Sequence, residues 1–246
     1  LIVKFLYKIS QPFAHKVFCQ NIEDYNYLIN KKLVRKENLD LLPGSGVDLQ
    51  RFNTKLKLKE ANKNSIFTFL YAGRMLKDKG VHELVRAFSE VGEENKKCKL
   101  ILCGFTDVDN RSAITKDELD LISNIPNIEW IGSTDKIEDI LSYVDCVILP
   151  SYREGLPKIL LEAGAMGLPS LASDVPGCRN VIQEGVNGLL FKPKSSDSIK
   201  NSIYRVLEMS DSEILTMGLS ARKIVEENFD EQIVISKFFS VLNESQ

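Results

Sequence analysis

Between residues 66 and 191, short apolar segments alternate with segments of helical periodicity, and this alternation restricts the fold more than any other feature. The segment 98–104 (CKLILCG) has a continuous apolar centre, which is typical of a strand covered on both faces. Strands that alternate with helices predict an α/β fold with a parallel, doubly wound, Rossmann-like sheet. The predicted strands are 66–73, 98–104, 127–132, 144–150, 169–173 and 188–191.

Helices occupy the intervals between these strands and the segment after the last one. In the segment 80–91, Val81, Leu84, Val85 and Phe88 recur at helical spacing. Ligands bind doubly wound sheets outside the carboxyl ends of the strands, so the loops that follow the strands are where function is expected. The other predicted helices and helical turns are 116–123, 137–143, 157–166, 178–184, 196–209, 211–226 and 232–242.

Residues 1–48 form a separate strand–helix–strand pattern that is too small to bury its own core. It consists of a helix that ends near Gln11-Pro12, strands at 16–19 and 39–43, and a helix at 22–33. The following Gly44-Ser45-Gly46 lacks the third glycine and the helix of a dinucleotide fingerprint, so it is interpreted as an interdomain loop. The polar, lysine-rich segment 53–65 is predicted to be an exposed connection and a domain boundary.

The composition excludes several classes of function. With 246 residues and a net charge of -2, the chain offers no electrostatic basis for binding nucleic acid or an anionic membrane surface. There is no run of about 18 apolar residues that could span a membrane, and the N-terminal LIVKFLYKI is too short for a signal peptide. Five scattered cysteines without a C-x-x-C pair indicate a reducing compartment and argue against a zinc site.

The stretch 151–169 (SYREGLPKILLEAGAMGLP) combines two glutamates with a predicted helix start. Gly155 would let the backbone approach a ligand, and Pro157 suits the first helical position. A helix N-terminus with free N–H groups attracts phosphate. Glu162 is the only charge in the apolar run 159–172, and its buried carboxylate would need hydrogen bonds such as those of ligand hydroxyl groups. The alternative is that Glu154 is a solvated loop acid and that Glu162 bonds a neighbouring turn.

The loop after the first of the six strands, GRMLKDKG at 73–80, carries Arg74 and Lys79. Two cations at the carboxyl end of a strand could neutralise a diphosphate, both in the ground state and as a leaving group. A solvated basic turn is the alternative interpretation. The loops CGFTDVD, GSTD and SYREG follow the next three strands. Together the four loops would form a diphosphate site with room for a base and a ribose.

These motifs together resemble the retaining glycosyltransferases of family 4, which have the GT-B fold. The resemblance covers residues 66–210 through YAGRMLKDKG, LPSYREGLPKILLEAGAMGLP and SDVPGCRNVIQEGVNGLLF, in the family's order and spacing. The VPGCR form of the last motif is similar to that of bacterial capsule and O-antigen enzymes. The implied reaction transfers a sugar from a nucleotide diphosphate sugar, by analogy a UDP-sugar, to a hydroxyl acceptor, with retention and without a metal or other cofactor.

The resemblance implies roles for individual residues. Arg74 and Lys79 match the pair that holds the donor's diphosphate. Glu154 matches the first glutamate of the family's E-x7-E motif, near the transferred sugar and the phosphates, and these three residues are the predicted catalytic group. Glu162 matches the second glutamate, which binds ribose hydroxyls.

The other predicted binding residues act mainly through their backbone. Those of the 132–134 loop fall where the family holds the nucleobase, and Gly155 and Leu156 would offer backbone N–H groups to phosphate or sugar. These residues are Gly73, Gly132, Ser133, Thr134, Gly155, Leu156 and Pro157.

The family's acceptor-binding N-terminal domain is almost entirely absent, and the chain begins with Leu1, as expected of a piece of a longer protein. The predicted parts are 1–52, a remnant of that domain; 53–228, the nucleotide-sugar-binding domain; and 229–246, a helix that packs back toward the remnant. The missing domain would bind a lipid-linked or saccharide acceptor, and the piece alone would be inactive, with exposed apolar area that favours self-association. A cytoplasmic protein, peripheral on the inner face of the membrane, is expected.

Four weaker signals have a structural interpretation beside a functional one. Asp107-Val108-Asp109 resembles a D-x-D metal site, but a solvated acidic turn is expected, and no metal is predicted. His82 is expected to be a polar first-turn residue and His15 a structural one, because neither has a partner for nucleophilic catalysis. Arg179 could approach the donor or form a salt bridge within the fold.

Two other classes of function use the same architecture. One is a sugar-nucleotide epimerase or phosphorylase, for which the sequence has no motif, such as a lysine that holds pyridoxal phosphate. The other is a non-catalytic nucleotide-binding module. The intact set of Arg74, Lys79, Glu154 and Glu162 argues against the second class.

Overall fold

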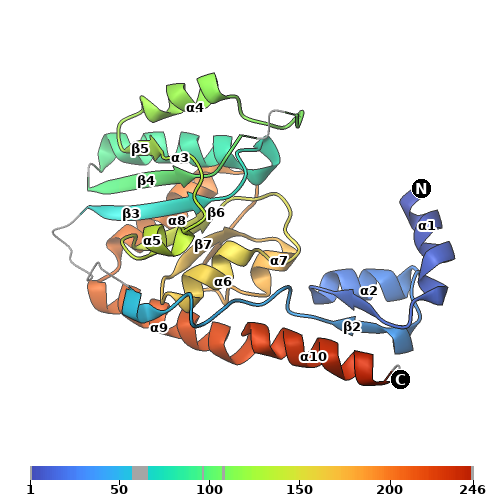
Figure 1. Ribbon diagram of the computed structural model, residues 1–246. Coiled ribbons are helices and arrows are strands. Elements are labelled where there is room, and N and C mark those ends of the chain that lie inside the picture. Colours follow the sequence, from blue (N-terminus) through green and yellow to red (C-terminus); the bar gives the residue numbers. More distant parts are fainter. Residues whose placement is uncertain (1, 57–65, 96, 107–108, 245–246) are drawn as a thin grey trace.

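The computed structural model describes residues 2–56, 66–95, 97–106 and 109–244, and this part of the chain forms two parallel sheets of very different size (Figure 1). The larger sheet has six strands in the order β5-β4-β3-β6-β7-β8. It confirms the predicted doubly wound α/β fold. The strands are β3 (Phe67–Ala72), β4 (Cys98–Cys103), β5 (Ile128–Trp130), β6 (Cys146–Leu149), β7 (Ser170–Ser173) and β8 (Gly188–Phe191).

The strand order changes direction between β3 and β6. From β3 the chain moves outward to β4 and β5, and it then returns to the other side of β3 for β6, β7 and β8. β3 and β6 are directly paired, with Phe69 opposite Cys146 and Leu70 opposite Val147. The loops after β3 and β6 therefore leave the sheet side by side and in opposite directions, which is where doubly wound sheets bind ligands.

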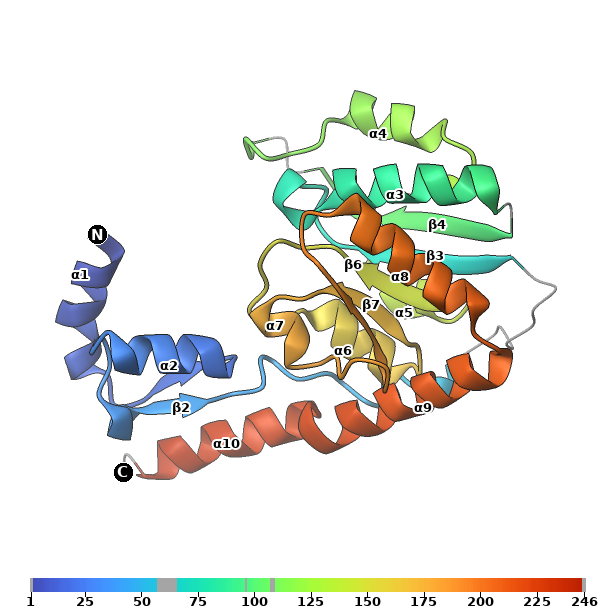
Figure 2. The ribbon, with the colours of Figure 1, turned by 180° about the vertical axis from the view of Figure 1, so that it is seen from behind.

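Helices cover both faces of the larger sheet (Figures 1 and 2). On one face α3 (Val81–Glu94) packs against α8 (Ser196–Glu208), and on the other α6 (Lys158–Ala165) packs against α9 (Asp211–Asn228). This cover explains why the four residues of β6 and the four of β7 are all buried. Three further helices complete this part: α4 (Lys116–Ser123), α5 (Ile137–Leu141) and α7 (Pro176–Arg179).

The smaller sheet pairs β1 (Val17–Cys19) with β2 (Leu39–Leu41), and α1 (Ile2–Ser10) and α2 (Ile22–Asn30) accompany it. We call these elements the smaller unit, and β3 to β8 with α3 to α9 the larger unit. The buried apolar cluster of the smaller unit consists of Cys19, Leu33, Val34 and Leu39. The apolar side chains of α1 are exposed: Ile2, Val3, Phe5, Leu6 and Ile9.

Two connecting segments of the chain, called here the two passages, link the smaller unit to the larger one, and they contact each other. The first follows β2, and the second leads from α9 into α10 (Glu231–Glu244), which runs alongside the smaller unit (Figure 1). They meet where the Val47 N–H donates to the Phe229 carbonyl at 2.9 Å and the Glu231 N–H donates to the Val47 carbonyl at 3.2 Å. Farther along α10, the ring of Phe238 stacks on that of Phe18, with centroids 6.1 Å apart.

Several predicted boundaries differ from the observed ones for local reasons. The predicted helix 22–33 ends at Asn30, because Lys32 adopts a left-handed φ of 50° and the Leu33 N–H turns back to the Leu28 carbonyl at 2.9 Å. The predicted helical turn 178–184 is instead α7, which starts at Pro176. Pro157 is the N-cap of α6 and not its first helical residue. Residues 57–65 of the predicted connection, and Asp107 and Val108 of the predicted acidic turn, lie outside the described residues.

Candidate functional site

An ion pair between Lys79 and Glu154 joins the two loops at the point where the strand order changes direction. Lys79 ends the 3₁₀ helix η4 (Lys77–Lys79) after β3, and Glu154 lies between β6 and α6. The Lys79 Nζ is 2.7 Å from the Glu154 Oε1, and the two side chains are only 21% and 14% exposed. Glu154 is therefore not the solvated loop acid of the alternative interpretation. The structure brings together two of the three predicted catalytic residues.

Close packing of the two loops sets this geometry. Gly80 follows Lys79 with a left-handed φ of 73°, and a Cβ atom at this position would lie 2.1 Å from the Pro150 carbonyl oxygen. No side chain fits there, so the position requires glycine. The Tyr152 N–H also donates to the Asp78 carbonyl at 3.0 Å. The loop after β3 is thereby held against the loop after β6.

The third predicted catalytic residue, Arg74, lies earlier in the same loop after β3. A buried tyrosine holds its backbone, because the Tyr71 hydroxyl donates to the Arg74 carbonyl at 2.8 Å. Burial raises the pKa of Tyr71, so the hydroxyl keeps its proton and can act as this donor. Arg74 itself is exposed, as is the neighbouring Gly73. The loop backbone is thus fixed while the guanidinium stays accessible at the edge of the sheet.

Two backbone N–H groups at the start of α6 have no acceptor within the described chain. They belong to Gly155 and Leu156, and both residues are half-buried. The helix that follows, with Pro157 as its N-cap, has the positive end of its dipole on the same side. Half-buried N–H groups beside a helix start and next to Lys79 form a suitable seat for an anion.

Glu162 is buried in α6, with 8% of its surface exposed. Burial raises the pKa of its carboxyl group, and the positive charges of Lys158 and Arg51 oppose this shift. The nearest cation, the Lys158 Nζ, is 3.9 Å away and largely exposed. No group of the described chain donates a hydrogen bond to the carboxylate, so the alternative contact with a neighbouring turn is absent. A buried carboxylate with unfilled acceptor positions is suited to ligand hydroxyl groups.

The predicted base-binding residues Gly132, Ser133 and Thr134 lie in the loop after β5, at the same edge of the sheet. The Gly104 N–H, at the end of β4, donates to the Gly132 carbonyl at 2.7 Å, and the Thr134 Oγ1 accepts from the Lys136 N–H at 3.0 Å. Ser133 and Thr134 are exposed. The loop is therefore anchored at both ends, with Ser133 and Thr134 at the surface between them.

Sequence reasoning assigned no role to Arg51. This residue lies in the segment after β2, and its side chain contacts the loop after β5. Its guanidinium donates to the Asp135 carbonyl at 2.8 Å and pairs with the Glu138 carboxylate, also at 2.8 Å. The pairing lowers the pKa of Glu138. The only sequence signal was the position of Arg51 in GSGVDLQRF, which gives no indication of a partner 87 residues away.

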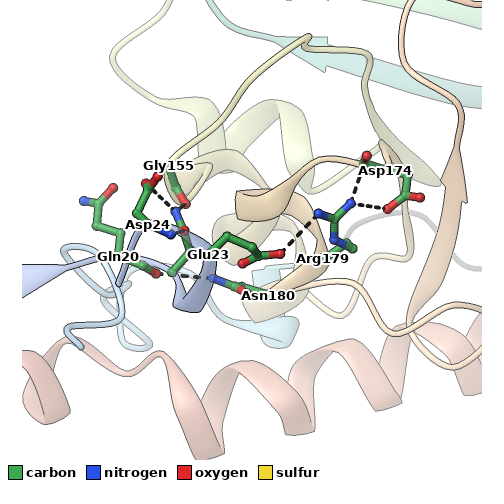
Figure 3. A network of polar contacts seen from close by, with 8 residues as sticks. Gln20, Glu23, Asp24, Gly155, Asp174, Arg179 and Asn180 are labelled. Carbon is green, nitrogen blue, oxygen red and sulfur yellow. Dashed lines mark hydrogen bonds and ion pairs between the residues drawn. The ribbon is translucent and has the colours of Figure 1, made fainter. Parts of the chain in front are cut away.

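The remaining candidates are occupied elsewhere in the fold. His82 is 2.7 Å from the Glu118 Oε1, on α4, and His15 is exposed between α1 and β1. The Arg179 guanidinium pairs with Asp174 and Glu23, as expected of a salt bridge within the fold (Figure 3). All five cysteines are free and buried. Among the described residues, no cluster of three or more histidine, cysteine and carboxylate side chains could hold a metal ion, and no helix is long and apolar enough to cross a membrane.

A doubly wound sheet with cations and unpaired N–H groups where its strand order reverses is characteristic of proteins that bind phosphorylated ligands. The sequence pattern described as "Glycosyl transferases group 1" matches residues 53–223, more than half of the chain. The chain therefore belongs to this family, and the resemblance found in its motifs is confirmed.

Similar proteins include two bacterial enzymes. The capsular polysaccharide biosynthesis glycosyltransferase CapM of Staphylococcus aureus is 27% identical in an alignment of 239 positions that covers 96% of this chain and 60% of that protein. The N,N'-diacetylbacillosaminyl-diphospho-undecaprenol alpha-1,3-N-acetylgalactosaminyltransferase of Campylobacter jejuni is 27% identical in an alignment of 250 positions that covers 98% of this chain and 63% of that enzyme. The chain thus spans less than two thirds of the length of these relatives.

A solved structure confirms the fold class. The crystal structure of Anabaena HepE in complex with UDP and glucose superposes with a TM-score of 0.83 and 19% sequence identity. The match covers 98% of this chain and 66% of that structure. At this identity the likeness concerns the fold.

Proposed function

We propose that this chain is the donor-binding part of a retaining glycosyltransferase that acts in the synthesis of a bacterial polysaccharide or glycolipid. The observation that carries the proposal is the Lys79–Glu154 pair, 2.7 Å apart at the reversal of the strand order and beside the unpaired N–H groups of Gly155 and Leu156. Membership of the glycosyl transferase group 1 family supports it. The names of the capsule and undecaprenol enzymes favour this biosynthetic context, and the UDP complex of the structural neighbour favours a UDP-sugar donor.

The donor diphosphate would lie between the loop after β3 and the start of α6. An ammonium group has three N–H donors, so Lys79 can keep its bond to Glu154 and still donate to a phosphate oxygen. Arg74 and the two backbone N–H groups would supply further donors. Glu162 would accept from the ribose hydroxyls, and the 132–134 loop would hold the base.

In the reaction, the acceptor hydroxyl oxygen bonds to the anomeric carbon on the face from which the diphosphate oxygen departs, and the hydroxyl proton leaves with the diphosphate. Negative charge develops on the departing diphosphate, where Lys79 and Arg74 stabilise it. Glu154 orients Lys79. Because Glu154 would also lie near the transferred sugar, it would help to position that sugar. Since these cations and N–H groups come from the protein, we infer that the transfer requires no metal ion.

The acceptor would be a lipid-linked or saccharide hydroxyl that binds mainly through residues beyond this chain. We infer that 53–228 form the donor-binding domain, and that 1–52 and 229–246 belong with the acceptor-binding part. The protein would work in the cytoplasm, at the inner face of the membrane. This chain alone would bind donor without transferring sugar, and it would self-associate through the exposed apolar side chains of α1.

Calorimetric titration of the chain and of the full-length protein with UDP, GDP and ADP, with and without EDTA, tests this function. UDP should bind in EDTA, and Lys79→Met should weaken its binding by about 10- to 100-fold, because a charge-assisted contact is lost. Lys200→Met is the matched control, since Lys200 also pairs with a glutamate, Glu90, but between α3 and α8. Failure of the full-length protein to bind any of the three nucleotides, or equal binding by the Lys79 variant, would refute the proposal.

A further inference from the structure

Asn21, in the smaller unit, reaches across to the loop that carries Glu154. It is 1% exposed, and its Nδ2 donates to the Gly155 carbonyl oxygen at 3.2 Å. The same amide caps α2, because its Oδ1 accepts from the Asp24 N–H at 2.7 Å. A buried side chain of one unit thus contacts the backbone beside a predicted catalytic residue of the other.

Helix capping alone does not account for an asparagine at this position. A cap needs one side-chain oxygen, which serine or aspartate supplies equally well. Only an amide offers N–H donors in addition, and Asn21 uses them on the Gly155 carbonyl and, at 2.9 Å, on the Asp24 carboxylate. The contact with Gly155 is therefore separable from the cap.

Holding the Gly155 carbonyl also sets the direction of the next N–H group. The described chain has no cis peptide bond, so the Gly155 C=O and the Leu156 N–H point in opposite directions from one planar unit. Asn21 draws the carbonyl toward α2 and thereby turns the Leu156 N–H away from α2. That N–H has no acceptor in the described chain.

Neighbouring contacts keep α2 in place against this loop (Figure 3). Arg179 of α7 pairs with Glu23 at 3.1 Å, and the Asn180 side chain donates to the Gln20 carbonyl at 3.3 Å. From the α7 side, a Cβ atom at Gly177 would lie 2.4 Å from the Gly155 carbonyl oxygen, so only glycine allows this approach. The carbonyl lies between α7 and α2 and has little freedom to rotate.

We propose that Asn21 is a positioning residue that presents the Leu156 N–H to the donor diphosphate. This inference rests on the proposed function, because it assigns a phosphate to that N–H. It follows that the position of the smaller unit relative to the larger one affects donor affinity. If α2 moves away from the loop, the hydrogen bond from Asn21 breaks and the peptide unit between Gly155 and Leu156 can rotate. The effect concerns the phosphates and not the nucleoside.

Asn21→Ser in the full-length protein tests the inference, since serine retains the cap and removes the amide donor. The affinity for UDP should fall about tenfold, while the affinity for uridine, measured by ligand-observed NMR, should stay within about twofold. In the free protein, the amide resonance of Leu156 should move. Asn21→Asp should weaken UDP binding further, because a carboxylate would then face the Gly155 carbonyl. Asn180→Ala, which alters the same interface without touching Gly155, should leave the ratio of the two affinities unchanged.

Unchanged UDP affinity in Asn21→Ser, or an equal loss for UDP and uridine, would overturn the inference in favour of a purely structural role. An unmoved Leu156 resonance would overturn it as well. That last measurement needs no ligand, so it tests whether Asn21 orients the Leu156 N–H separately from whether the protein binds a nucleotide, and the failure of the inference can be told from the failure of the proposed function.

Discussion

The two units of this chain are built on the same parallel strand pairing but differ in how they are stabilised. Strands β3, β4, β6 and β7 of the larger unit are covered on both faces and bury nearly all of their side chains. The smaller unit buries a cluster of four apolar residues and leaves the apolar side chains of α1 exposed. The larger unit therefore contains most of the hydrophobic stabilisation. The smaller unit contributes contacts that orient the candidate site.

Polar contacts join α2 and the two residues before it to the larger unit. They include the Arg179–Glu23 pair and the hydrogen bonds from Asn21 to Gly155 and from Asn180 to Gln20. The exposed Arg179–Glu23 pair can be broken and remade at low cost, unlike an apolar core. The comparison teaches that stability and positioning are assigned to different parts of the chain.

The largest expected effect comes from emptying the core of the larger unit. Phe69 is fully buried in β3, and Phe69→Ala should lower the free energy of unfolding by about 3–5 kcal/mol. Leu39→Ala, in the cluster of the smaller unit, is the matched test and should leave the main transition in place. Urea unfolding followed by the fluorescence of Trp130, the only tryptophan and part of β5, reports on the larger unit. Equal shifts of the urea midpoint in both variants would mean that the two units unfold as one, and the proposed difference in stabilisation between them would be wrong.

An intermediate effect is expected from Glu162. Because burial raises the pKa of this carboxyl group in the folded state, the folded protein binds its proton more tightly than the unfolded chain does. Its contribution to stability is thus greatest at low pH and is lost as pH rises through the raised pKa. Glu162→Gln should make the free protein more stable than wild type at pH 8 and reduce this pH dependence.

The same substitution should weaken UDP binding about tenfold, because ribose hydroxyls would lose a charged acceptor. Thermal unfolding between pH 4 and pH 8, with calorimetry of UDP binding, checks both effects. A variant that is less stable than wild type at pH 8 would show that Glu162 is a structural residue and not a ligand-binding one.

The smallest effect is expected from the Arg179 pair between the units. Its side chain is 40% exposed, so Arg179→Met should change the free energy of unfolding by less than about 1 kcal/mol, and less at high salt. Arg205→Met is the control, because Arg205 pairs with Glu184 at similar exposure within the larger unit. A clearly larger loss for Arg179→Met would mean that the interface stabilises the fold.

The sequence predicted the features that depend on neighbouring residues. The apolar centre of 98–104 and the helical spacing of 80–91 were sufficient to place β4 and α3, and with the other segments they predicted the doubly wound sheet. The loop rule for such sheets then placed Lys79 and Glu154 at one edge. Their 2.7 Å contact follows from this topology, although the assigned roles of these residues stay predictions.

Contacts between distant residues had no local signal. Asn21 precedes a helix, which indicates a cap, but nothing in QNIED points to Gly155, 134 residues away. Arg51 likewise gives no sign of its partners in the loop after β5. The offset of Pro157 from the first helical position to the N-cap is a difference of one residue, which periodicity does not resolve.

The crossing at Val47 and Glu231 has a mechanical consequence. Two passages that touch at one point, joined by hydrogen bonds of 2.9 and 3.2 Å, leave a body attached through them little freedom to slide. The displacement that strains this junction least is rotation about an axis through it. For a rotation of given size, a point moves in proportion to its distance from the axis. A rotation about this junction would therefore move the far end of α2 farther than the residues beside Val47.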